Sequence, residues 1–262
     1  NTIHEDLERV ESSKRLISEI NMGATAIGTR VNAPEDYPEL VTQYLGKLTG
    51  LPLFLAHDLI EATSDTGAYV QLSGVLKRTA IKVSKICNDL RLLSSGPRTG
   101  FNEINLPQMQ PGSSIMPGKV NPVIPEVVNQ TAFYVIGADV TVTMAAEAGQ
   151  LQLNVMEPVI AFSLFSSISW MQRACETLRT KCVDGITANE RYTKDLVMNS
   201  VGIVTLLNPI IGYEQSASIA KEALKTGKSI HEIAVVERKV VSQEKWNELY
   251  SIENLINPKF IL

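Results

Sequence analysis

Two long apolar stretches, residues 126–153 and 158–182, constrain the fold of this chain more than any other feature. Strands in globular proteins rarely exceed about ten residues, so stretches of this length favour helices. The first stretch is apolar on nearly every side, and such a helix has to be buried in a large bundle or between subunits. Val140–Thr143 has β propensity, but no turn residues bracket it, and helix remains the better interpretation.

Other parts of the chain also show helical periodicity. Residues 67–93 have apolar side chains spaced by threes and fours, which predicts a long amphipathic helix. Residues 3–22 predict a helix that ends at Gly23 in a left-handed cap, and residues 38–48 predict a short one. The polar face of the 67–93 segment is expected to be a solvated surface, and its basic residues are Lys77, Arg78, Lys82, Lys85 and Arg91.

The texture of the sequence changes beyond Gly185, where short helical patterns alternate with Pro and Gly. We therefore expect an all-α chain with a central helical-bundle domain over residues 1–186 and a small C-terminal helical domain over residues 187–262. The first residues already lie within a helical pattern and lack an initiator Met, so we expect that an N-terminal domain is absent.

Charge and cysteine content exclude several classes of protein. The 24 basic and 28 acidic residues give a net charge of −4, which offers no electrostatic footprint for nucleic acid or an anionic membrane. No segment is long and apolar enough to cross a bilayer. Cys87, Cys175 and Cys182 form no CxxC motif and have no histidine nearby, which argues against zinc and a disulfide framework. We expect buried thiols, a cytoplasmic location, and neither nucleic-acid nor membrane partners.

Residues 110–122 form the most informative segment, because glycines and prolines frame two hydroxyls, one ammonium and one carboxamide. A phosphate-binding P-loop does not fit: five residues rather than four separate Gly112 from Gly118, and Val120 replaces the Ser or Thr that binds magnesium. Neither serine is followed by a lysine three residues later, and no histidine lies nearby to form a triad. Spacing alone predicts an anion-binding loop or a structural turn.

The segment Gly112–Pro122 (GSSIMPGKVNP) resembles the signature loop of the fumarase/aspartase superfamily, and the likeness extends along essentially the whole chain. Residues 125–130 and 144–158 are most similar to the aspartases, whereas class II fumarases typically have Arg in place of Glu157. The resemblance implies a long-helix bundle that forms the core of a homotetramer. The loop residues that match are Gly112, Ser113, Ser114, Ile115, Met116, Pro117, Gly118, Lys119, Val120 and Asn121.

The chemistry implied by the resemblance is elimination of ammonia from L-aspartate to give fumarate, with no organic cofactor and no metal. Charge builds up on the substrate carboxylate as a proton leaves the β-carbon, and stabilising that charge is the main catalytic task. The resemblance makes Ser113 the base, as an alkoxide, with Ser114, Lys119 and Asn121 binding the substrate. It makes Glu126 the partner that orients a histidine from another segment. The alternative for Glu126 is an acidic residue that complements the helix dipole.

The resemblance also predicts that something is missing. Active sites of the superfamily combine three sequence segments from three subunits, and only the segment around Ser113 is present here. We therefore expect the C-terminal part of a longer lyase, inactive alone. Two alternatives stay open: a hydratase that adds water to fumarate, and a non-catalytic helical scaffold of the kind that some members form in the eye lens.

Two positions depart from the pattern of the superfamily. Arg30 stands where relatives generally have Gly, so a positive φ there would be costly. Ala138 stands in a segment where Gly-Asn-Asp is usual. Neither position belongs to the signature loop.

Overall fold

The computed structural model describes residues 2–112, 115–116 and 118–257. It divides into two compact units, Asn1–Thr187 and Ala188–Leu262, and each is described separately. The boundary inferred from the sequence lies one residue earlier. None of the helices in the described part of the chain has the length and apolar composition needed to cross a membrane.

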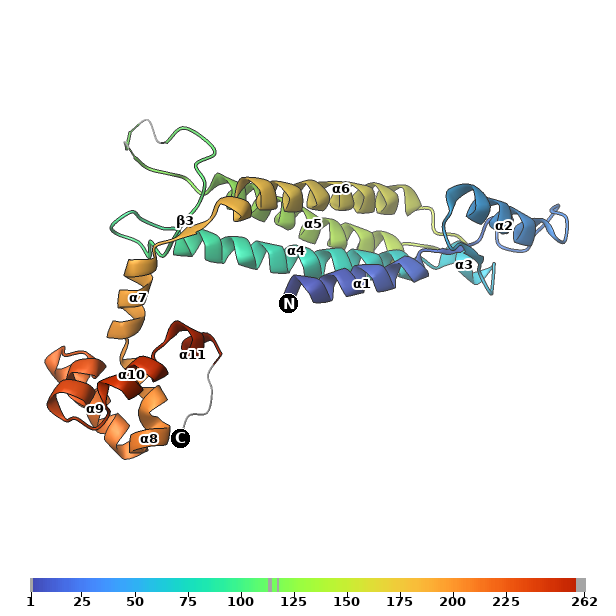
Figure 1. Cartoon of the computed structure of the whole chain (residues 1–262). Coiled ribbons are helices and arrows are strands. Elements are labelled where there is room, and N and C mark those ends of the chain that lie inside the picture. The colour runs from blue at the N-terminus through green and yellow to red at the C-terminus, as the bar shows by residue number, and fades with distance from the viewer. Residues whose placement is uncertain (1, 113–114, 117, 258–262) are drawn as a thin grey trace. The chain divides into compact units, whose positions relative to one another are not determined.

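The first unit is built on three long helices, α4 (Gly67–Leu93), α5 (Val123–Glu147) and α6 (Glu157–Lys181). They run side by side, and α1 (Thr2–Leu16) lies along α4 (Figure 1). The prediction of an all-α helical bundle is confirmed, because the amphipathic stretch and the two long apolar stretches of the sequence form these three helices. The departure at position 138 leaves α5 continuous.

Apolar side chains fill the space between these helices. The largest cluster of this core consists of Ala80, Val83, Cys87, Val128, Ala132, Val135, Met171, Ala174, Leu178 and Cys182. Two of the three cysteines, Cys87 and Cys182, are buried as expected, but the expectation for Cys175 is wrong, because it is exposed.

The basic face of α4 is only in part the solvated surface that its sequence suggested: Lys85 and Arg91 are exposed, but the other three basic residues have buried acidic partners. The Lys77 ammonium lies 2.5 Å from the buried carboxylate of Asp139 on α5. Arg78 and Lys82 each lie 3.1 Å from Asp6, which is buried on α1. The prediction failed for these three residues because both acidic partners come from other helices, which periodicity within α4 does not reveal.

The chain leaves α1 earlier than its periodicity predicted. Instead of continuing to residue 22, it forms a short strand β1 (Glu19–Ile20), which pairs in parallel with β2 (Phe54–Leu55). The Ile20 carbonyl accepts a hydrogen bond from Ala56 N–H at 2.9 Å. Pairing with a distant segment therefore overrides local helical preference, and Gly23, although its φ is +93°, lies outside the helix end.

Two further helices complete this end of the bundle. The helix α2 (Tyr37–Thr49) has Pro in its first turn and ends at Gly50, whose left-handed φ of +69° caps it. The short helix α3 (Glu61–Ser64) follows β2.

Arg30 lies in the loop before α2 with a φ of +60°. This left-handed conformation costs an L-residue roughly 1–2 kcal/mol. The Arg30 N–H donates to the Ala24 carbonyl at 2.9 Å, and the guanidinium pairs with Glu39 at 3.3 Å. The departure from the superfamily pattern therefore falls on a strained backbone position, as the sequence analysis anticipated.

At the opposite end of the bundle, a long loop over residues 94–122 connects α4 to α5 (Figure 1). Within it lies the short strand β3 (Ile104–Asn105), and Asn105 Nδ2 donates to Thr187 Oγ1 at 3.1 Å. Thr187 belongs to β4 (Thr187–Ala188), which follows the short 3₁₀ helix η1 (Val183–Gly185) at the end of α6. The loop is thus hydrogen-bonded to the segment that follows α6.

The second unit consists of short helices around an aliphatic and aromatic core. Its elements are α7 (Glu190–Asn199), the 3₁₀ helix η2 (Val201–Leu207), α8 (Asn208–Ile211), α9 (Tyr213–Thr226), the π-helical η3 (Glu232–Glu237), α10 (Gln243–Leu249) and α11 (Ile252–Ile256). Leu207, Ile219 and Ile233 are fully buried. Tyr250 O–H donates to the Ile203 carbonyl at 2.8 Å, which ties α10 to η2.

Candidate active site

The signature loop narrows to a neck at which its two arms touch. A Cβ atom on Gly112 would lie 2.5 Å from the carbonyl oxygen of Lys119, so the position has room for glycine alone. Between these residues, Lys119 N–H donates to the Met116 carbonyl at 3.2 Å, and Gly118 has a φ of +81°. A glycine with positive φ is what a tight turn of this kind requires. Ser113, Ser114 and Pro117 lie outside the described residues.

The predicted ligands after the neck lead directly into α5. Lys119 is exposed, and Asn121 and Glu126 are half-buried. The Glu126 N–H donates to the Pro122 carbonyl at 3.1 Å, which places Glu126 in the first turn of the helix. Among the residues that the structure describes, neither Lys119 nor Glu126 forms an ion pair. Both charges are therefore available to a ligand or to another segment.

A cavity of about 140 Å³ lies between the loop and the chain that precedes it. Gly118 and Val120 line one side, and residues 94–106, including Gly96 and Asn102, line the other. A water molecule takes about 30 Å³, so the cavity is of a size for a few waters or a very small ligand. The sequence analysis did not predict this contact.

A buried polar network next to Glu126 was also missed. The Asn129 side chain, one turn further along α5, has its Nδ2 at 2.8 Å from Ser84 Oγ and 3.1 Å from Asn88 Oδ1. Its Oδ1 accepts a hydrogen bond from Arg91 Nη1 at 3.3 Å. The signal that could have revealed the network is a single amide residue on the buried face of an otherwise apolar helix.

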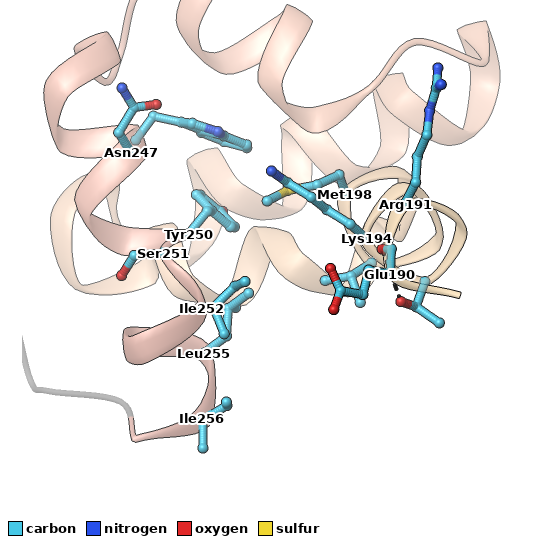
Figure 2. A pocket seen from close by; sticks show the side chains of 13 residues that line it. Glu190, Arg191, Lys194, Met198, Asn247, Tyr250, Ser251, Ile252, Leu255 and Ile256 are labelled. Atoms are coloured by element: carbon cyan, nitrogen blue, oxygen red, sulfur yellow. Dashed lines mark hydrogen bonds between the residues drawn. The ribbon is translucent and has the colours of Figure 1, made fainter. Parts of the chain in front are cut away.

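The second unit has a hollow of its own, of about 960 Å³. Figure 2 shows α7 side chains such as Lys194 and Met198 on one side, and Tyr250 and Leu255 from the segment of α10 and α11 on the other. Trp246 also lines the hollow, and its ring stacks on Tyr250 with centroids 3.8 Å apart. No described residue of the signature loop lines this hollow.

Burial suppresses the thiol chemistry of Cys87. Burial, reinforced by Cys182 and Cys175, raises the pKa of the Cys87 thiol to about 12, so the thiolate that nucleophilic catalysis needs is suppressed. Within residues 2–112, 115–116 and 118–257, no group of three or more His, Cys, Asp or Glu side chains converges as metal ligands do.

Comparisons with known proteins agree with the loop and the fold. The family model described as "Lyase" matches residues 1–137, and the one described as "Fumarase C C-terminus" matches residues 203–257. The chain therefore belongs to the lyase family, as the resemblance of its signature loop predicted.

Individual relatives show which members of the family the chain resembles. The aspartate ammonia-lyase of Helicobacter pylori (strain ATCC 700392 / 26695) is 60% identical over 256 residues, which are 98% of this chain and 54% of the relative. A crystal structure of a fumarate lyase:delta crystallin from Brucella melitensis, bound to cobalt, is 50% identical with a TM-score of 0.89 and covers 94% of this chain and 53% of that one. The structure of a class II fumarase from Schistosoma mansoni is 33% identical with a TM-score of 0.87. It covers 94% of this chain and 55% of the fumarase. The chain thus spans about half the length of each.

Proposed function

We propose that this chain is part of an aspartate ammonia-lyase, which eliminates ammonia from L-aspartate and releases fumarate. The observation that carries the proposal is the 60% identity to the Helicobacter pylori aspartate ammonia-lyase across 98% of the chain. The glycine neck and the available charges of Lys119 and Glu126 support it, because these residues flank, in the sequence, the serines that the resemblance assigns to catalysis.

In the proposed reaction, Ser113 acts as an alkoxide and takes a proton from the β-carbon of aspartate. The electron pair moves onto the adjacent carboxylate, which becomes an aci-carboxylate. It then returns to form the carbon–carbon double bond as the carbon–nitrogen bond breaks and ammonia leaves. Ser113 ends as a neutral hydroxyl and has to lose that proton before the next turnover.

The remaining loop residues stabilise and orient the substrate. Lys119 supplies a positive charge and Asn121 a directional amide bond to a substrate carboxylate, where charge builds up in the transition state. Ser114 donates a further hydrogen bond. Glu126, in the first turn of α5, orients a histidine from a segment outside this chain.

We further propose that the site is completed by assembly into a homotetramer through the long helices. Large apolar side chains on the outer faces of α5 and α6 support this, since Phe133, Phe162 and Phe165 are between 60% and 73% exposed in the single chain. Patches of this kind mark protein interfaces. The free thiols and the net charge of −4 fit a cytoplasmic enzyme with neither nucleic-acid nor membrane partners.

The function is tested by mixing the chain with the N-terminal part of the Helicobacter pylori relative that precedes the matched region. We expect no ammonia release from L-aspartate by the chain alone, and clear release after mixing. Activity of the chain alone would contradict the incomplete-site proposal.

Two alternatives predict different results in the same mixture. A hydratase, favoured by the 33% identity to a class II fumarase, would form malate from fumarate and release no ammonia from aspartate. A helical scaffold would do neither, yet would assemble to the same particle size with Ser113→Ala as with the unaltered chain. The higher identity to the aspartate ammonia-lyase makes ammonia release the expected outcome.

A further inference from the structure

The start of α5 is weakly fixed by local interactions. Its N-cap residue, Pro122, makes no side-chain capping hydrogen bond, although such a bond commonly contributes about 1 kcal/mol. Pro125, in the first turn, has no N–H to donate. Pro125 is fully buried and Ile124 packs on the core cluster, so apolar contacts hold this turn, and its polar tether to α4 has to come from further along the helix.

Asn129 supplies the first buried polar contact after this turn. Its side chain is 2% exposed, and Nδ2 lies 2.8 Å from Ser84 Oγ and 3.0 Å from the Ser84 carbonyl on α4. Asn88 Oδ1 is a third acceptor at 3.1 Å, and Arg91 Nη1 donates to Asn129 Oδ1 at 3.3 Å. Both ends of the amide are thus engaged, which fixes its orientation and ties it to three residues on one face of α4.

The apolar contacts around Asn129 do not define the sliding position of α5 along α4 as sharply. They are non-directional, and they combine small side chains, such as Ala80, Val83, Val128 and Ala132, with the larger, partly buried Leu90 and Ile124. A buried Asn in a largely apolar helix seam helps to specify register, because any other register leaves its polar atoms without partners. Asp139 bonds α4 at the far end of the seam, so Asn129 is the polar contact at the end next to the loop. Glu126 lies three residues before Asn129 and so shares its face of the helix.

We propose, building on the function proposed above, that Asn129 is a positioning residue for the reaction. By fixing the loop-side end of α5 against α4, it fixes where Glu126 and Asn121 lie at the signature loop. Arg91 has the same positioning role, because it donates a hydrogen bond to the amide oxygen and so keeps the Nδ2 donors of Asn129 turned toward Ser84.

The helix offers a matched control. Asp139, ten residues further along α5, is also buried and also bonds a buried serine of α4, because Ser73 Oγ donates to Asp139 Oδ1 at 2.8 Å. At 1.5 Å per residue it lies about 15 Å from Asn129 along the helix axis, away from the loop. Asp139 also holds the Lys77 ammonium at 2.5 Å, so Asp139→Ala removes at least as strong a set of buried polar contacts as Asn129→Ala, but far from the loop.

The experiment compares both variants in two measurements. The first is the kcat for ammonia release after mixing with the N-terminal part of the Helicobacter pylori relative. The second is amide hydrogen exchange of residues 123–128 in the chain by itself, together with its resistance to urea. We expect both variants to unfold at lower urea. Asn129→Ala lowers kcat about tenfold or more, because displacing a catalytic group by 1 Å can cost on the order of a hundredfold, whereas Asp139→Ala changes it less than about twofold. Exchange of residues 123–128 rises in Asn129→Ala alone.

Equal effects of the two variants on kcat, or unchanged exchange at residues 123–128 in Asn129→Ala, would overturn the proposal. If the unaltered chain releases no ammonia after mixing, the proposed function fails on its own account. The exchange measurement then still decides whether Asn129 fixes the start of α5.

Discussion

The carbonyl oxygen of Lys119 lies 2.5 Å from the place that a Cβ atom on Gly112 would occupy. Real Cβ atoms essentially never come within 3.0 Å of another heavy atom in this way, so a side chain at residue 112 has to push the two arms of the loop apart. The loop holds both predicted carboxylate ligands just beyond this neck. Its geometry therefore depends on the absence of one methyl group.

Gly112→Ala is expected to impair catalysis without unfolding the chain. The loop is exposed, so the free energy of unfolding should change by no more than about 0.5 kcal/mol. Displacement of Lys119 should lower kcat/KM for ammonia release after mixing by about tenfold or more.

Gly74→Ala is the matched control for this variant, because a Cβ there would meet nothing within 4 Å and the residue lies inside α4. It should keep activity and raise stability by about 0.5–1 kcal/mol. Full activity of Gly112→Ala would show that the neck does not position Lys119.

Arg30 permits a direct measurement of backbone strain. Arg30→Gly removes the cost of the left-handed φ and the ion pair with Glu39, whereas Arg30→Ala removes the ion pair and keeps the strain. An exposed ion pair contributes at most about 1 kcal/mol. We expect the Gly variant to be more stable than the Ala variant by about 1 kcal/mol in urea unfolding. Equal midpoints for the two variants would show that Arg30 is unstrained.

The buried thiol of Cys87 should make stability depend on alkaline pH. Burial raises its pKa from 9.0 to about 12, so above pH 9 the unfolded chain loses a proton that the folded chain retains. The folded state then binds more protons than the unfolded state, and the free energy of unfolding falls as pH rises from about 9 toward 12.

Urea midpoints at pH 8, 9 and 10 measure this effect. Cys87→Ala should weaken the decline with pH, although it also lowers stability at every pH by leaving a small cavity. Val83→Ala, which leaves a cavity in the same cluster without removing a thiol, is the control and should leave the decline in place. An identical decline in Cys87→Ala and the unaltered chain would rule out Cys87 as its source.

The sequence pattern predicted the long helices well. Sustained apolar spacing indicated α4, and the length of the two apolar stretches indicated α5 and α6. The limits of α4 at Gly67 and Leu93 follow from the sequence pattern alone. The helix prediction for residues 17–22 was wrong because β1 forms its hydrogen bonds with β2, which lies more than thirty residues away in the sequence. Local pattern has no access to such pairing.

The candidate site likewise has features that the sequence predicts and features that depend on long-range contacts. Resemblance supplied the identities of the loop residues, including Lys119, Asn121 and Glu126, but spacing left the loop as an anion site or a turn. The neck at Gly112 and the network of Asn129 depend on which backbones and helix faces meet. Those contacts emerge only once the chain is folded.

The central claim is that Ser113 is the catalytic base of a site completed by a preceding segment. The most direct test is the rate of ammonia release from L-aspartate by Ser113→Ala after mixing with the N-terminal part of the Helicobacter pylori relative. Ser12→Ala, at an exposed serine of α1, serves as the control. We predict unchanged particle size and helicity for both variants, full activity for Ser12→Ala, and a loss of about a hundredfold or more for Ser113→Ala. Retention of more than about a third of the rate by Ser113→Ala would contradict the account.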